Sequence, residues 1–265
     1  MQLTVLVDNN TALNKQYLGE PGLSFYLEDG SEKILFDCGY SDLFRRNARQ
    51  MGIDLSGVTK VVFSHGHDDH TGGLSALMEV LPKTTVITHP DTFREKRNRG
   101  ENAGSIFRTG ELAEKYELHL ARKPQKVSEH LTFLGEIPRI NDFEPRIQFG
   151  EYNSPEGFVP DFVMEDSALV YERDDGIFLI TGCSHAGICT MAAYAGTLFK
   201  KPVKGIIGGF HLKMMDERTE KVISGLEALG VRELYPCHCT SFAVKAAIHQ
   251  KIPCGEVGVG TKITW

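Results

Sequence analysis

The sequence predicts an α/β fold in which helices cover the outer faces of β-sheets. Short apolar, β-branched runs alternate along the chain with longer segments of helical periodicity. Two pairs of these runs surround turn-forming residues, at 23–36 and 168–181, and predict β-hairpins. Helical segments follow each hairpin, which is the order expected when helices pack outside sheets.

The same patterns predict the individual strands and helices before residue 90 and after residue 161. Before residue 90 we expect strands at 3–7, 23–27, 34–36, 58–63 and 85–88, and helices at 44–51 and 73–80. After residue 161 we expect strands at 168–172, 176–181, 205–207 and 233–235, and helices at 188–199, 217–229 and 241–250.

The stretch from about residue 90 to 161 has weak periodicity and is richer in charge and proline. Its arginines include Arg94, Arg97, Arg99, Arg108, Arg139 and Arg146. We interpret it as a segment inserted into the core fold, forming a cap over a site. A solvated surface segment would have the same composition.

Bulk properties exclude several classes of protein. The 265 residues carry a net charge of −6, which lacks the basic balance typical of nucleic-acid binding. No apolar run is long enough for a membrane span, and the first residues do not resemble a signal peptide. Six cysteines without such a signal indicate a reducing compartment. We therefore expect a cytoplasmic protein.

The sequence HGHDDH at residues 65–70 directly follows a predicted buried strand and indicates a metal site. If the backbone is locally extended, His65 and His67 point the same way and reach one ion, while Asp69 and His70 address a second. Imidazole and carboxylate suit zinc, our first choice, and also iron, nickel or manganese. We expect one or two divalent transition metal ions. An accidental surface cluster is the alternative, but the position after a buried strand disfavours it.

HGHDDH followed by TGG resembles the metallo-β-lactamase fold superfamily. The resemblance implies a four-layer αββα sandwich and a single domain over residues 1–265, with the inserted segment at about 90–161. Residues 22–39, GLSFYLEDGSEKILFDCG, are similar to the early hairpin of that superfamily. This similarity implies that Asp37 is a buried carboxylate that holds a metal-bound histidine in one tautomer. The alternative for Asp37 is a turn residue.

The second half of the site departs from the superfamily pattern. Cys183 stands in TGCSHAG, where most members have an aspartate that bridges two metals. A thiolate is a good soft ligand, although a buried core cysteine is the alternative. Superfamily members usually have a further histidine ligand before this strand, and this chain has none there. His185 could supply that ligand, and Asp166 is the nearest match to its usual position. His238 matches the final ligand, whereas His211 could be a ligand, a catalytic group or a capping histidine.

The order of the motifs resembles one branch of the superfamily, which includes the 7,8-dihydropterin-6-methyl-4-(β-D-ribofuranosyl)-aminobenzene-5'-phosphate synthases and many metal-dependent hydrolases. We expect a hydrolase that acts on a small anionic, phosphorylated metabolite through a metal-activated water, with Asp69 and His211 as catalytic groups. The alternative is a synthase-like transferase that joins a pterin-methyl diphosphate to an aminobenzene riboside phosphate and releases diphosphate. A non-catalytic metal-binding or redox protein is a second alternative.

Two further residues are candidates for substrate binding. Arg139, in GEIPR, matches a motif of the branch and could hold a phosphate through two hydrogen bonds. Asn9, in VDNN, could line the site from the end of the first strand. A solvated charge and a turn residue are the respective alternatives. We expect a small anionic substrate, no nucleic-acid or membrane partner, and leave open a homo-oligomer.

Overall fold

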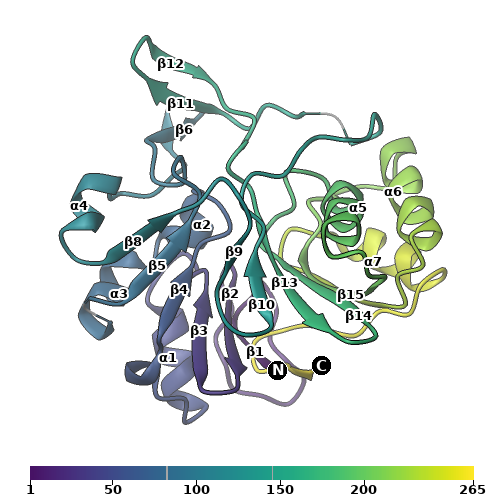
Figure 1. Cartoon of the computed structure of the whole chain (residues 1–265), viewed down its shortest axis with the longest axis horizontal. Helices are drawn as coiled ribbons and strands as arrows, with labels where there is room; N and C mark the ends of the chain where they lie inside the picture. Colours follow the sequence, from purple (N-terminus) through teal and green to yellow (C-terminus); the bar gives the residue numbers. More distant parts are fainter. Residues whose placement is uncertain (82, 145) are drawn as a thin grey trace.

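The computed structural model describes residues 1–81, 83–144 and 146–265, and it contains two large sheets that pack face to face between layers of helices (Figure 1). The first sheet has the strand order β17-β1-β2-β3-β4-β5-β8. Its strands are β1 (Gln2–Val7), β2 (Ser24–Asp29), β3 (Glu32–Phe36), β4 (Lys60–Val62), β5 (Thr85–Thr88), β8 (Glu117–Leu120) and β17 (Lys262–Thr264). The helical segments of this half are α1 (Leu43–Gln50), η1 (Leu55–Gly57), α2 (Asp68–Thr71), α3 (Leu74–Val80) and α4 (Thr109–Ala113).

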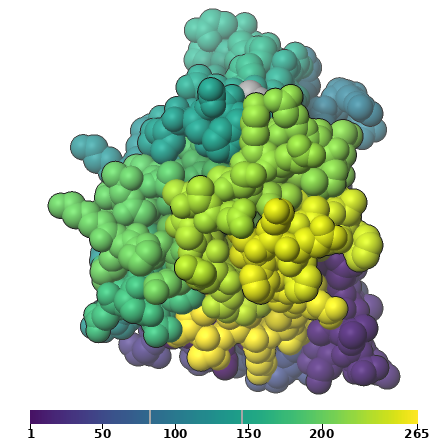
Figure 2. All heavy atoms as spheres, turned by 90° about the vertical axis from the view of Figure 1, so that its right-hand side faces the viewer, coloured from purple at the N-terminus to yellow at the C-terminus, as the bar shows by residue number. Residues whose placement is uncertain are grey.

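The second sheet comes from the later part of the chain and has the order β16-β15-β14-β13-β10-β9. Its strands are β9 (Gln125–Lys126), β10 (Leu131–Phe133), β13 (Ala168–Arg173), β14 (Gly176–Thr181), β15 (Val203–Gly209) and β16 (Glu233–Cys237). Its helices are α5 (Ile188–Phe199), α6 (Glu217–Ala228) and α7 (Phe242–His249). Figure 2 shows the face that this later, green and yellow part of the chain covers.

Alternation of side chains along each strand explains the layers. Phe36 of β3 belongs to the apolar cluster between the two sheets, which also contains Ile180 of β14. The preceding residues point the other way, so Leu35 packs in the cluster with α1 and α3, and Leu179 packs in the cluster with α5, α6 and α7. Because both faces of these strands are buried, the sequence shows continuous apolar runs. The expected αββα sandwich is confirmed.

The parallel strands of each sheet decide where a site can form. β3, β4 and β5 run parallel to one another, and so do β14, β15 and β16. Loops that follow the carboxyl ends of parallel strands meet at one edge of a sheet. The segments after β4, β14, β15 and β16 carry the histidine and cysteine motifs. The fold therefore gathers four motifs that are far apart in sequence.

The prediction that residues 90–161 leave the core is wrong for part of that segment. β8 is the edge strand of the first sheet, and β9 and β10 extend the second. These strands are only two to four residues long, and β8 is half exposed at its edge, so neither length nor periodicity marks them. Another part of the segment forms a separate sheet of four strands, hereafter the small sheet: β6 (Lys96–Asn98), β7 (Glu101–Asn102), β11 (Glu151–Ser154) and β12 (Gly157–Pro160).

Within the part of the chain that the structure describes, no helix combines the length and apolar character needed to cross a membrane.

Candidate metal centre

The HGHDDH segment lies in the tight turn that follows β4 and continues into α2; residues 63–70 are hereafter the ligand turn. Glycine is needed at its centre, because a Cβ atom on Gly66 would lie 1.9 Å from the carbonyl oxygen of Thr92. His67 precedes the first residue of α2 and has an extended backbone. The turn therefore directs several histidine rings into the same buried space.

Three histidines form the first donor group, hereafter the three-histidine group: His65, His67 and His185. One ring nitrogen from each lies within 4.8 Å of the others. Nε2 of His65 is 3.0 Å from Nδ1 of His67, and Nε2 of His185 is buried without a hydrogen-bond partner among the described residues. Burial, followed by the charge of Lys96, lowers the pKa of His67 to about 3, and burial holds the pKa values of the other two well below normal. The three rings are therefore neutral, the form that binds metal.

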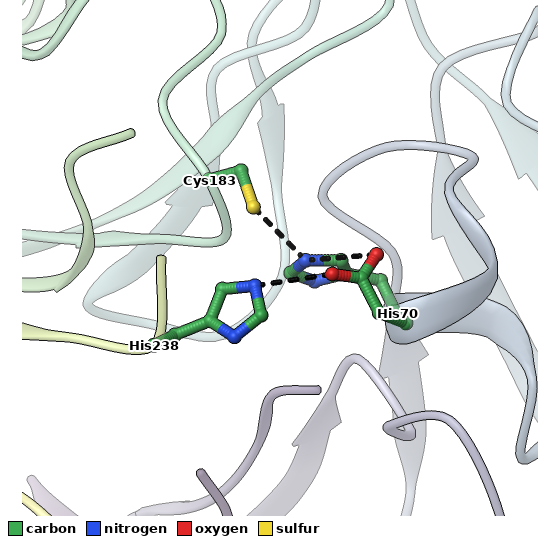
Figure 3. Close-up of side chains that lie close together, drawn as sticks. His70, Cys183 and His238 are labelled. Atoms are coloured by element: carbon green, nitrogen blue, oxygen red, sulfur yellow. Dashed lines mark hydrogen bonds and ion pairs between the residues drawn. The ribbon is translucent and has the colours of Figure 1, made fainter. Parts of the chain in front are cut away.

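The second donor group, hereafter the cysteine group, combines Asp69, His70, Cys183 and His238. Nε2 of His70 lies 3.2 Å from Sγ of Cys183, and Nε2 of His238 lies 3.2 Å from Oδ2 of Asp69. Figure 3 shows His70, Cys183 and His238 pointing toward one another from three different elements. Burial raises the pKa of the Cys183 thiol well above its ordinary value, so metal binding here is coupled to loss of the thiol proton.

The two donor groups meet at the turn that follows β14. Cys183, His185 and His211 also place one donor atom each within 4.8 Å of one another, so this set shares one residue with each group. The donor atoms suit divalent metal ions: several histidine nitrogens are buried without a hydrogen-bond partner among the described residues, and one thiol and one carboxylate lie beside them. These donors suit zinc or iron.

Neighbouring side chains contact the ring nitrogen of two donor histidines that points away from the donor group. Oδ2 of Asp37 is 2.7 Å from Nδ1 of His70, and Oδ1 of Asn9 is 2.9 Å from Nδ1 of His238. Each contact leaves Nε2 of the ring facing the donor group. Asp37 therefore lies where the resemblance implies. Asn9 also lines the cavity that opens onto both donor groups, but its side-chain oxygen contacts His238 and is not free for a substrate.

Ser64 contacts His65 by a hydrogen bond, and Asp166, which was considered as the nearest match to a ligand, lies beside the same ring. Oγ of Ser64 lies 2.9 Å from Nδ1 of His65, and Oδ1 of Asp166 lies 4.0 Å from the same atom. Asp166 is absent from the donor groups found among the described residues, and the ligand position that it nearly matched in sequence is filled by His185. Burial raises the pKa of Asp166 to about 7.

Arg139 does not face the cavity, and its predicted role in substrate binding is wrong. Its guanidinium donates to the carbonyl oxygen of His185 at 2.5 Å and to those of Phe162 and Val163 at 3.3 and 3.1 Å. Sequence alone cannot distinguish a phosphate from a cluster of carbonyls as the partner of a guanidinium. In this protein the arginine fixes the turn that carries His185.

We therefore expect Arg139→Gln to lower stability and metal binding without a specific effect on substrate affinity. The shorter amide cannot reach all three carbonyl groups, and each buried acceptor left unpaired costs about 1–3 kcal/mol. Urea unfolding of the metal-free protein measures the loss. A KM that rises for anionic substrates while stability stays normal would restore the substrate-binding role.

A cavity of about 530 Å³ opens onto both donor groups. Within the described chain, Lys213 is the only lysine or arginine that lines it. The ring of Phe149 covers the histidines, with centroid distances of 4.8 Å to His67, 5.3 Å to His185 and 5.4 Å to His211. The sequence analysis missed both residues. The only signal for Phe149 was its place in a segment suspected of covering the site.

Several residues of the site have a left-handed backbone that non-glycine residues rarely adopt. The φ angle is 56° at Asp37, 58° at Ser184, 50° at His211 and 49° at His238. Each follows a strand directly or within three residues. Strained residues of this kind persist where the surrounding structure holds them and concentrate at functional sites.

Comparison with known proteins agrees with the fold. The family model of the metallo-β-lactamase superfamily matches residues 18–231, so the chain belongs to this superfamily. Two proteins of Methanocaldococcus jannaschii are each 30% identical to it. One is an uncharacterized protein, aligned over 94% of both chains, and the other is the 7,8-dihydropterin-6-methyl-4-(β-D-ribofuranosyl)-aminobenzene-5'-phosphate synthase, aligned over 91% of this chain and 88% of that protein.

A solved structure is similar over the whole length. The crystal structure of Tm1679, described as a metal-dependent hydrolase of the β-lactamase superfamily, superposes with a TM-score of 0.86 at 28% identity. The match covers 100% of this chain and 99% of that one.

Proposed function

We propose that this protein is a metal-dependent hydrolase of a small anionic, phosphorylated metabolite. The observation that carries the proposal is that the three-histidine group and the cysteine group adjoin at the base of one cavity. Divalent ions held there would supply Lewis acidity, which polarises a phosphoryl oxygen and makes water a better nucleophile. The description of Tm1679 as a metal-dependent hydrolase supports this reaction class.

The protein's own residues would orient and hold the substrate. Lys213 places its ammonium 5.8 Å from the ring centroid of Phe149, on the lining of the cavity, where it can attract an anionic group. His211 also lines the cavity and can exchange a proton with the reacting molecule. Asp69 would serve both as a ligand and in orienting the attacking group.

The proposal predicts bound metal in protein purified without added metal. We expect about two equivalents of transition metal, one for each donor group, and His67→Ala should lose at least half of it. Elemental analysis measures both values. Metal-replete wild type should also release phosphate from a panel of phosphate monoesters, diesters and diphosphates, and His67→Ala should not.

Less than about one-tenth of an equivalent of metal in the wild type would contradict metal-dependent catalysis of any kind. Metal-replete protein that releases nothing from the panel would contradict hydrolysis alone.

The second candidate is a synthase-like transferase. The relative from Methanocaldococcus jannaschii favours it, since the similarity covers most of both chains. The ring of Phe149 over the histidines also favours an organic nucleophile over water, because it shields that side of the centre. The direct test is diphosphate release from a dihydropterin-methyl diphosphate and an aminobenzene riboside phosphate. Metal-replete protein that forms no joined product would remove this candidate.

A further inference from the structure

Lys96 is a buried cation beside the ligand turn, contributed by β6 of the small sheet. It is 3% exposed, and its two carboxylate partners, Asp161 and Glu165, are 2% and 3% exposed. Nζ of Lys96 contacts Oδ2 of Asp161 and lies 2.9 Å from Oε1 of Glu165. Burial alone would lower the pKa of Lys96, but Glu165 and Asp161 outweigh burial and raise it, so the lysine remains charged.

Glu165 and Lys96 both contact the middle of the ligand turn. The backbone N–H of Gly66 donates to Oε1 of Glu165 at 3.4 Å. Cε of Lys96 would lie only 3.0 Å from a Cβ atom on Gly66, so the lysine stem packs directly against this glycine. Because Gly66 separates His65 from His67, these contacts fix the spacing of two metal-binding side chains.

Asp161 connects the same lysine to the aromatic wall of the cavity. The carbonyl oxygen of Asp161 accepts a hydrogen bond from the N–H of Phe149 at 2.7 Å, and its own N–H donates to Gly150 at 3.0 Å. Asn98, the last residue of the strand β6 that also carries Lys96, lines the cavity as well. The lysine therefore joins the metal-binding turn to the segment that covers it.

We propose that Lys96, Asp161 and Glu165 form a buried ionic cluster that positions the metal ligands relative to the Phe149 wall. This role rests on the metal centre of the proposed function. A buried ion pair contributes little net stability, because desolvation offsets the attraction between the charges. The cluster is therefore better explained by the geometry it imposes. All three are positioning residues, since none of them lines the cavity described above.

The test separates geometry from stability. In Lys96→Met two buried carboxylates lose their cation, so both the stability of the metal-free protein and its metal affinity should fall. The triple variant Lys96→Met, Asp161→Asn, Glu165→Gln removes every charge while keeping the shapes. We expect it to recover stability in urea unfolding, while its metal affinity, measured by competition with a chromophoric chelator, stays at least about tenfold below wild type.

Lys60→Met is the matched control. Lys60 pairs with Glu32 at 2.5 Å at the start of the strand that leads into the ligand turn, and its loss should leave metal affinity unchanged. If Lys96→Met does not fold, the triple variant decides. A folded variant of the cluster with metal affinity within about twofold of wild type overturns this role, since loss of a partner behind a ligand costs about 10–100-fold. A wild type that binds no metal overturns the proposed function first, and this role with it.

Discussion

Cys183→Ser is expected to reduce the bound metal by about half and to abolish activity. Cys183 belongs to the cysteine group but not to the three-histidine group, so the latter should still hold its ion. A serine hydroxyl does not ionise near neutral pH, whereas a thiol in contact with a metal is deprotonated outright. Elemental analysis gives the stoichiometry. The loss of turnover should exceed the roughly 10–100-fold that removal of a partner behind a ligand costs.

Two companion variants make this result specific. Cys189→Ser is the matched control, because this cysteine is buried in α5 and its thiol donates only to the carbonyl oxygen of Val222, a bond that serine can keep. Cys183→Asp introduces the carboxylate that the superfamily resemblance implies at this position, and it should recover the second ion. Two full equivalents of metal in Cys183→Ser would show that the thiol is not a ligand.

A cysteine at the junction of the two donor groups also bears on the reaction. A thiolate transfers more charge to a bound cation than a carboxylate does, which weakens the Lewis acidity available to the substrate. Hydrolysis depends on that acidity to activate water, while transfer with a good leaving group depends on it less. Metal content and the rates of hydrolysis and transfer should therefore both be measured for Cys183→Asp. More hydrolysis in the aspartate variant would favour transfer as the native reaction.

The sequence predicted the part of the site that depends on local spacing. The histidine pattern at 65–70 needs only one turn after one strand, so its donors could be named before the fold was known. His238 was predictable from the resemblance, as the match to the final ligand of the superfamily. The two long hairpins were also predictable, because each is a continuous apolar pair of strands around a turn.

Contacts between segments far apart in sequence were not predictable. His185 was named as a candidate ligand, but its grouping with His65 and His67 depends on how the two sheets pack, which brings the segments after β4 and β14 together. The direction of a long side chain is equally hidden, which is why Arg139 was assigned to a phosphate instead of to three carbonyl groups. Lys96 carried no signal at all, since a lysine in a charged segment normally lies at the surface.

Asp37→Asn should fold normally yet lose metal affinity by about 10–100-fold at the cysteine group. Asp37 accepts three hydrogen bonds: from the N–H and hydroxyl of Ser64, at 2.8 and 2.7 Å, and from Nδ1 of His70, at 2.7 Å. Asparagine can still accept from the Ser64 N–H through its oxygen. Its amide nitrogen then faces His70, which must move its proton to Nε2 and so lose the lone pair that binds metal.

The chain offers a close control for this variant. Asp29 is also buried and holds a histidine, with Oδ1 at 3.1 Å from Nδ1 of His130, but this pair lies outside the donor groups. Asp29→Asn should therefore match Asp37→Asn in any loss of stability while keeping full metal affinity. Chelator competition on both variants, with urea unfolding of both metal-free proteins, measures the difference. Equal metal affinity in Asp37→Asn and wild type would mean that the carboxylate supports the fold alone and does not set the tautomer of His70.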